Sequence, residues 1–127
     1  MNRMQNRVFQ DKRRQTRIHM QIDCQFKSND KEYDALMLDL SNGGTLLSHT
    51  FDTGLEDLPV QEDKISITLD MDGLKVPLTL TGTVKRSSYG VSEFGNVVQF
   101  GVEFEDKPLE LLKLINFLSA RRKRVRV

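Results

Sequence analysis

Hydrophobic and polar residues alternate along several short stretches of this chain with a period of two. The first stretch runs from Ile18 to Phe26, where every second residue is apolar. A strand that is buried on one face has this period, because successive side chains point to opposite sides. Similar stretches cover residues 33–40, 45–48, 65–71, 74–84 and 98–104. The sequence therefore predicts six short strands.

Turn-forming residues separate these stretches and favour antiparallel neighbours. Ser28-Asn29-Asp30 follows the first predicted strand, and Asp72-Gly73 is a strong hairpin signal. A turn is expected at residues 41–44, a long surface connection over residues 49–63, and a loop with two glycines over residues 87–95.

The alternation also predicts which face of each strand meets the core. In the 33–40 strand, Leu36, Leu38 and Leu40 are expected to share the core face, with Asp39 on the opposite face. In the 74–84 strand the expected core face carries a set of aliphatic residues, namely Leu74, Val76, Leu78, Leu80 and Val84.

The period changes after Phe104 and predicts a helix. Asp106 is suited to cap it and Pro108 to occupy its first turn. A broad apolar stripe follows, made of Leu109, Leu111, Leu112, Leu114, Ile115 and Leu118. Together these patterns predict an all-β fold, a small six-stranded antiparallel barrel with a C-terminal α-helix against an open side or end.

Composition narrows the class of protein. A chain of 127 residues predicts one domain. Cys24 is the single cysteine, which excludes an internal disulfide and favours a reduced, cytoplasmic setting. The N-terminus is polar and no apolar run reaches the roughly 18 residues of a membrane span, so neither a signal peptide nor a membrane span is expected.

The net charge of +1 conceals two basic ends around an acidic body. Residues 1–17 hold six basic residues and one acid, and residues 121–127 hold five basic residues. The middle of the chain, residues 18–120, holds 8 basic and 17 acidic residues. Basic ends either bind an anionic partner or are solvated arms. Residues 1–12 lack periodicity and are expected to form a flexible arm, and residues 121–127 a basic tail that docks an acidic partner or continues the helix.

The turn between the second and third strands carries polar groups that suit a ligand. Asp39 and Ser41 are two positions apart, so in an extended chain both point to the same side. A carboxylate accepts from the N–H donors of a guanine, and a serine donates or accepts. Gly43 and Gly44 permit positive φ and a close approach of backbone to a ligand. The alternative is a purely structural Asx-type turn.

A basic cluster lies just before the first strand. Arg13 and Arg17 share a face in either helical or extended chain, and Arg14 lies beside them. Arginine is suited to bidentate contact with phosphate or with guanine O6 and N7, and its plane stacks on a base. The alternative is a solvated basic segment.

Together, Arg13-x-x-x-Arg17 and Asp39-x-Ser41-x-x-Gly44 resemble the paired signature of PilZ domains, which are receptors for the bacterial second messenger cyclic di-GMP. The order of the motifs and their separation by a strand hairpin match the family. The segment Gly101-Val102-Glu103-Phe104 in the last strand, followed by a helix, is also similar. The resemblance covers most of the chain and implies a six-stranded barrel domain over residues 13–120.

The resemblance implies a cyclic di-GMP site and no cofactor. Arg13, Arg14 and Arg17 would engage phosphate and guanine edges, and Asp39 and Ser41 would contact a guanine beside Gly43 and Gly44. An arm that orders over the ligand couples binding to a change of shape. Such a change would signal to a downstream protein partner.

Arg86 is a weaker candidate for the same site. It lies at the end of the predicted fifth strand, on the parity of the apolar face, and is expected to emerge near the barrel mouth and stack on a guanine. The alternative is a surface charge beside Lys85.

Other residues do not indicate catalysis or a metal. His19 and His49 are isolated and lack metal-ligand spacing, and Cys24 alternates with core residues. No phosphate-binding glycine loop or nucleophile motif is present, so an enzyme is not expected. The rival hypothesis is a small barrel that binds nucleic acid or an acidic protein through its basic ends. Nucleic acid is disfavoured because the chain has no tryptophan and most of its phenylalanines lie on core parity.

Overall fold

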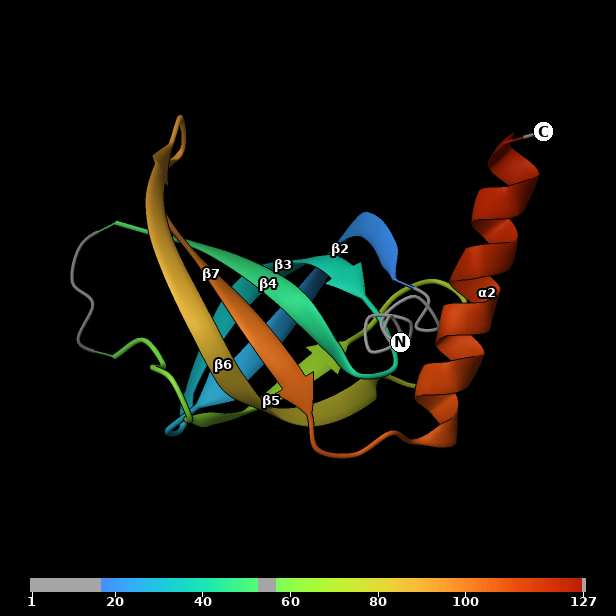
Figure 1. The fold of residues 1–127 in the computed structure, drawn as a ribbon, viewed down its shortest axis with the longest axis horizontal. Coiled ribbons are helices and arrows are strands. Elements are labelled where there is room, and N and C mark those ends of the chain that lie inside the picture. Colours follow the sequence, from blue (N-terminus) through green and yellow to red (C-terminus); the bar gives the residue numbers. More distant parts are fainter. Residues whose placement is uncertain (1–16, 53–56, 127) are drawn as a thin grey trace, which may run out of the picture.

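The computed structural model describes residues 17–52 and 57–126. This part of the chain contains six strands and one helix, joined by turns and loops. In chain order they are β2 (Ile18–Ser28), β3 (Lys31–Leu40), β4 (Gly44–Phe51), β5 (Lys64–Leu69), β6 (Leu78–Ser92), β7 (Gly95–Phe104) and α2 (Leu109–Arg126). The strands pair antiparallel and close into a barrel in the order β2-β3-β4-β7-β6-β5 (Figure 1). The expected fold class is confirmed.

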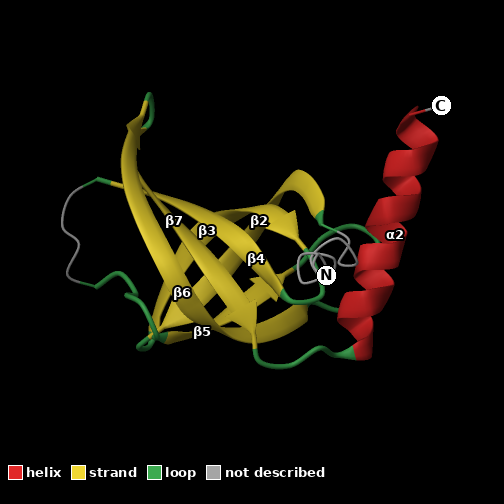
Figure 2. Cartoon of the chain, in the orientation of Figure 1, coloured by secondary structure: helices red, strands yellow, loops and turns green. Residues whose placement is uncertain are grey.

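The barrel interior is filled by the apolar face of each strand. In β2 the predicted alternation is confirmed, because Ile18, Ile22, Cys24 and Phe26 are buried and the residues between them are mostly exposed. The helix α2 stands across one end of the barrel (Figure 2) and closes the core there with four buried side chains, Leu111, Leu114, Ile115 and Leu118. Burial of these apolar faces is the main force that holds helix and barrel together.

A β-bulge in β3 changes the expected core face. Met37 pairs with Leu47 and Asp39 with Leu46, so Leu38 is an extra residue on β3 opposite β4. The bulge shifts the parity, which places both Met37 and Leu40 in the core with no exposed surface. The expectation that Leu36 and Leu38 share the core face with Leu40 was therefore wrong, and both are only half-buried.

The strands β6 and β7 are longer at their joined end than the sequence suggested. The loop expected over residues 87–95 is instead a hairpin whose pairing continues to Ser92 and Gly95. It projects beyond the barrel (Figure 1), and Val91 and Phe94 near its tip are exposed. Gly95 adopts a φ of 125°, which closes the tight turn and favours glycine.

The other end of β6 is shorter than expected. The strand begins at Leu78, and residues 70–77 form the connection from β5. Val76 is consequently 69% exposed, although the alternation had placed it on the core face. Pro77 immediately precedes the strand, at a position where a missing N–H costs no ladder hydrogen bond.

The two basic ends have different outcomes. The backbone of the C-terminal basic run continues α2 as far as Arg126, which is the helical alternative for that segment. The expected arm, residues 1–12, lies outside the described residues. Within the described part of the chain, no helix combines the length and apolar character that a membrane crossing requires.

Gly82 offers a test of how tightly β6 and β7 are packed. A Cβ at this position would lie 2.6 Å from the carbonyl oxygen of Glu103 and 2.7 Å from a methyl carbon of Val102. We expect Gly82→Ala to lower the free energy of unfolding by about 1–3 kcal/mol, because β7 must shift to admit the methyl group. Urea denaturation measures the change.

The matched control for this substitution is Gly90→Ala on the same strand. No atom lies within 4 Å of a Cβ at Gly90. This variant should be neutral or more stable by up to about 1 kcal/mol, because the alanine restricts the unfolded chain. Equal loss of stability in both variants would contradict the packing described here.

Candidate ligand-binding site

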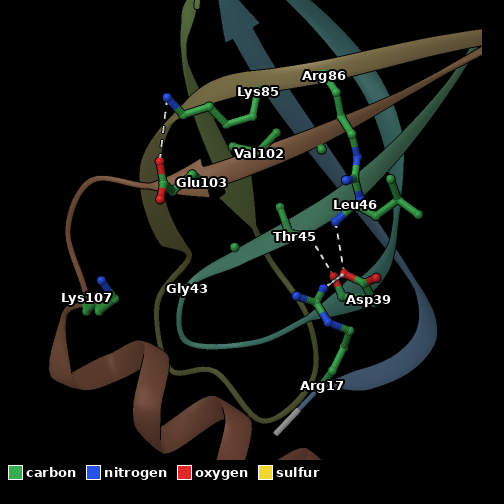
Figure 3. Close-up of a pocket in the computed structure, with 12 residues that line it drawn as sticks. Arg17, Asp39, Gly43, Thr45, Leu46, Lys85, Arg86, Val102, Glu103 and Lys107 are labelled. Atoms are coloured by element: carbon green, nitrogen blue, oxygen red, sulfur yellow. Dashed lines mark hydrogen bonds and ion pairs between the residues drawn. The ribbon is translucent and has the colours of Figure 1, made fainter. Parts of the chain in front are cut away.

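A pocket of about 550 Å³ opens on the outer surface of the barrel where β3, β4, β6 and β7 come together. Four cationic side chains and two carboxylates line it, namely Arg17, Lys85, Arg86, Lys107, Asp39 and Glu103 (Figure 3). The remaining lining comes from Gly43, Gly44, Thr45, Leu46, Gly101 and Val102. The volume falls within the roughly 300–1,000 Å³ range of small-molecule sites.

Asp39 joins the two polar clusters of the sequence. Its Oδ1 accepts a hydrogen bond from the guanidinium of Arg17 at 2.9 Å and another from the backbone N–H of Leu46 at 3.1 Å. The carboxylate is nearly buried whereas Arg17 is about half exposed, so the charge of the acid is compensated locally. The structure thus brings Arg17 and Asp39 together across 22 positions of sequence.

Ser41 is part of the turn and does not line the pocket. It has no exposed surface, and its hydroxyl donates to the carbonyl of Gly44 at 3.4 Å and accepts from the N–H of Gly43 at 3.2 Å. The backbone N–H of Ser41 also donates to Gly44, at 3.0 Å. These hydrogen bonds give Ser41 a turn-forming role, and its contact with a ligand stays a prediction.

The two glycines of the turn permit close contact with β7. Neither Gly43 nor Gly44 has a positive φ, so the turn does not use that conformational freedom. A Cβ at Gly44 would lie only 2.2 Å from the carbonyl oxygen of Val102, and the carbonyl of Gly43 accepts from the N–H of Phe104 at 3.0 Å. Both glycines line the pocket, and the lack of a side chain at Gly44 lets β4 lie against β7 there.

A second bulge brings Arg86 into the pocket. Val84 pairs with Val102 and Arg86 with Gly101, which makes Lys85 the extra residue on β6. Arg86 therefore points outward, although its parity with buried Val84 had placed it on the apolar face, and it lies within the strand. A Cβ at Gly101 would lie 3.0 Å from both Cγ and Nε of Arg86, so its side chain crosses the glycine toward Leu46 (Figure 3).

Sequence reasoning missed several lining residues and left two candidates untested. Thr45, Leu46, Lys85 and Lys107 belong to no motif, and Glu103 lies in the Gly101–Phe104 segment but was not a site candidate. The pairing of β4, β6 and β7 brings the residues of these strands to one place. Arg13 and Arg14 lie outside the described residues.

Neither Cys24 nor the histidines point to a second chemistry. Burial, helped by the negative charge of Asp23, raises the pKa of the Cys24 thiol to about 12, as expected for a core residue. His49 packs edge-on against Phe26 and Tyr33. Over residues 17–52 and 57–126, no cluster of histidine, cysteine and acidic side chains is suited to a metal ion.

The family model of the PilZ domain matches residues 11–120, and the chain belongs to this family. PilZ domain receptors are non-catalytic, which confirms for this domain the expectation that it is not an enzyme. No match is found among curated proteins.

Solved PilZ structures share the fold. The PilZ domain of YcgR from Escherichia coli, with c-di-GMP, has a TM-score of 0.67 and 19% identity, over 90% of this chain and 98% of that chain. The inhibitor of motility MotI/DgrA of Bacillus subtilis has a TM-score of 0.66 and 15% identity, over 100% of this chain and 56% of that chain. PlzA of Borreliella burgdorferi, in complex with c-di-GMP, has a TM-score of 0.60 and 16% identity, over 93% and 56%. This chain spans about half the length of the last two, and likeness at such identities concerns the fold.

The buried turn predicts that Ser41 acts on stability. We expect Ser41→Ala to lower the free energy of unfolding by about 1–2 kcal/mol, because the buried hydroxyl is lost and the N–H of Gly43 is left without its acceptor in a partly buried place. Thermal or urea denaturation measures the loss.

Ser92 supplies the matched control, because it makes the same pair of hydrogen bonds in an exposed turn. Its hydroxyl accepts from the N–H of Phe94 at 3.1 Å and donates to Gly95 at 3.2 Å. Water replaces these bonds, so Ser92→Ala should change stability by less than about 0.5 kcal/mol. A Ser41→Ala variant as stable as Ser92→Ala would argue against the buried role.

Cys24 should be unreactive in the folded protein. The thiolate is the nucleophile, and the raised pKa of about 12 leaves the thiol protonated at pH 8. A chromogenic disulfide reagent is expected to modify no thiol in the native protein and one thiol per chain in denaturant. Rapid modification of the native protein at pH 8 would contradict the burial of this side chain.

Proposed function

We propose that this PilZ domain is a cyclic di-GMP receptor whose ligand binds in the pocket beside β3, β4, β6 and β7. The observation that carries the proposal is the convergence of Arg17, Asp39 and Arg86 on one pocket from three separate parts of the chain. Cyclic di-GMP presents two phosphates and two guanines, and these three side chains match both kinds of group.

The two arginines are suited to different parts of the ligand. Arg17 is held by Asp39 with its guanidinium at the pocket edge, where it can donate to a phosphate. The stem of Arg86 rests on Gly101, so its planar guanidinium is available to stack on a guanine or to donate to O6 and N7.

Asp39 can accept from a guanine while keeping its structural contacts. Among the residues that the structure describes, both hydrogen bonds of the Asp39 carboxylate use Oδ1. Its Oδ2 is then left for the N1–H and N2–H donors of the base. The hydrogen bond from the backbone N–H of Leu46 to Oδ1 keeps the carboxylate in place as the ligand enters.

The proposal also includes the arginine segment before β2. Arg13 and Arg14 precede Arg17 by a few residues and would close over the ligand to complete its phosphate contacts. Ordering of this segment on binding would change the surface that a downstream protein partner meets. The YcgR and PlzA structures, which are described with c-di-GMP, support the choice of ligand.

Calorimetry with the purified protein tests the proposal. We expect saturable binding of cyclic di-GMP at micromolar ligand, and a loss of affinity of about tenfold or more for Arg17→Ala and for Arg86→Ala, the usual size for a charge-assisted contact. Arg86→Ala is the cleaner variant, because this side chain is exposed and its removal should not affect folding.

Lys27→Ala is the matched control, because Lys27 is an exposed cation on β2 that does not line the pocket. Its affinity should equal that of the wild type. Absence of binding by the wild-type protein would refute the proposal, and salt-sensitive binding of short RNA or DNA in its place would favour the rival nucleic-acid hypothesis.

A further inference from the structure

Lys85 lies on the edge of the pocket between two carboxylates. Its Nζ is 3.5 Å from Oε1 of Glu62 and 3.7 Å from Oε1 of Glu103. As the extra residue of the β6 bulge, it points away from Arg86 and toward Glu103 (Figure 3). Lys85 and Arg86 are neighbours in sequence, but their side chains therefore lie in different parts of the same pocket.

The ion pairs of Lys85 are weak and easily exchanged. The three side chains are between 47% and 66% exposed, and both distances are long for a charged hydrogen bond. Exposed pairs of this kind contribute little, because water screens them and long side chains lose freedom. A phosphate oxygen within the pocket would offer Lys85 a shorter, charge-assisted contact.

Glu62 is fixed next to the bulge by its backbone. Its N–H donates to the carbonyl of Val84 at 2.7 Å, and the N–H of Val84 donates to Asp63 at 2.9 Å. Its φ of 76° is unusual for a residue with a side chain, so this backbone position is held by its surroundings. Glu62 does not line the pocket, and its charge reaches the ligand chiefly through Lys85.

We propose that Lys85 is a further phosphate-binding residue, which Glu62 and Glu103 hold in ion pairs while no ligand is bound. This inference rests on the proposed function. The two carboxylates compete with the ligand phosphate for one ammonium group, so they lower the affinity of the pocket for its anionic ligand. Binding exchanges the two weak ion pairs of Lys85 for one contact with the ligand.

The competition predicts effects of opposite sign. Lys85→Met should weaken cyclic di-GMP binding by about tenfold, since one charged contact is lost. Glu62→Gln and Glu103→Gln should each strengthen binding by about two- to fivefold, the size expected for one exposed ion pair. In the Lys85→Met background, Glu62→Gln should have no further effect, because the two residues act through one interaction.

Glu105→Gln is the matched control for long-range charge. Glu105 lies two positions from Glu103 and pairs with Lys64 at 3.2 Å, but neither residue lines the pocket. This variant makes the same change of net charge and should leave the affinity unchanged. Calorimetry gives each affinity, and melting temperatures verify that each variant is folded.

The outcomes separate this inference from the proposed function. Wild-type binding with an unchanged affinity in Lys85→Met overturns the inference alone. So does a gain in Glu62→Gln that equals the gain in Glu105→Gln, or a gain that persists in the Lys85→Met background. A wild-type protein that does not bind cyclic di-GMP overturns the proposed function and the inference with it.

Discussion

The rest of the site depends on the hydrogen bonds that the carboxylate of Asp39 accepts. Its Oδ1 holds the guanidinium of Arg17 just before β2 and the backbone of Leu46 in β4, and the backbone carbonyl of Asp39 accepts from the Thr45 hydroxyl at 2.6 Å. A nearly buried charge is tolerated only where such partners compensate it. The same group therefore closes the β3–β4 turn and presents an arginine to the pocket.

Two β-bulges decide which side chains this site contains. The extra residue in β3 lets Asp39 face the pocket while Met37 and Leu40 on either side of it stay in the core. The extra residue in β6 turns Arg86 outward immediately after buried Val84. Bulges of this kind re-aim side chains without interrupting the barrel. The fold thus supplies outward-facing charge at positions where strict alternation would place it in the interior.

The same bulges explain how far the sequence could predict the structure. Alternation located β2 and the change of period located the helix, because burial of one face leaves a regular pattern. Turn-forming residues indicated the antiparallel neighbours. The two motifs each supply a residue of the ion pair between Arg17 and Asp39, which the sequence did not predict as a pair. Parity failed at Leu36, Leu38 and Arg86, because a single extra residue exchanges the two faces and leaves no sign in composition. Lys85 and Glu103 were missed because their proximity depends on the register of β6 against β7.

Ion pairs within the pocket offset the repulsion between its cations before a ligand binds. Four cations on an open surface would repel one another, yet Asp39 is paired with Arg17 and Glu103 with Lys85. The two ion pairs differ in how easily the carboxylate can move away from its cation. Asp39 is also bound to the backbone of Leu46, so it remains in place, whereas Glu103 is an exposed side chain that can turn away. The end of the pocket at Asp39 and Arg17 is therefore preorganised, and the end at Glu103 and Lys85 is adaptable. An anionic ligand would meet a fixed arginine at the first end and an exchangeable cation at the second.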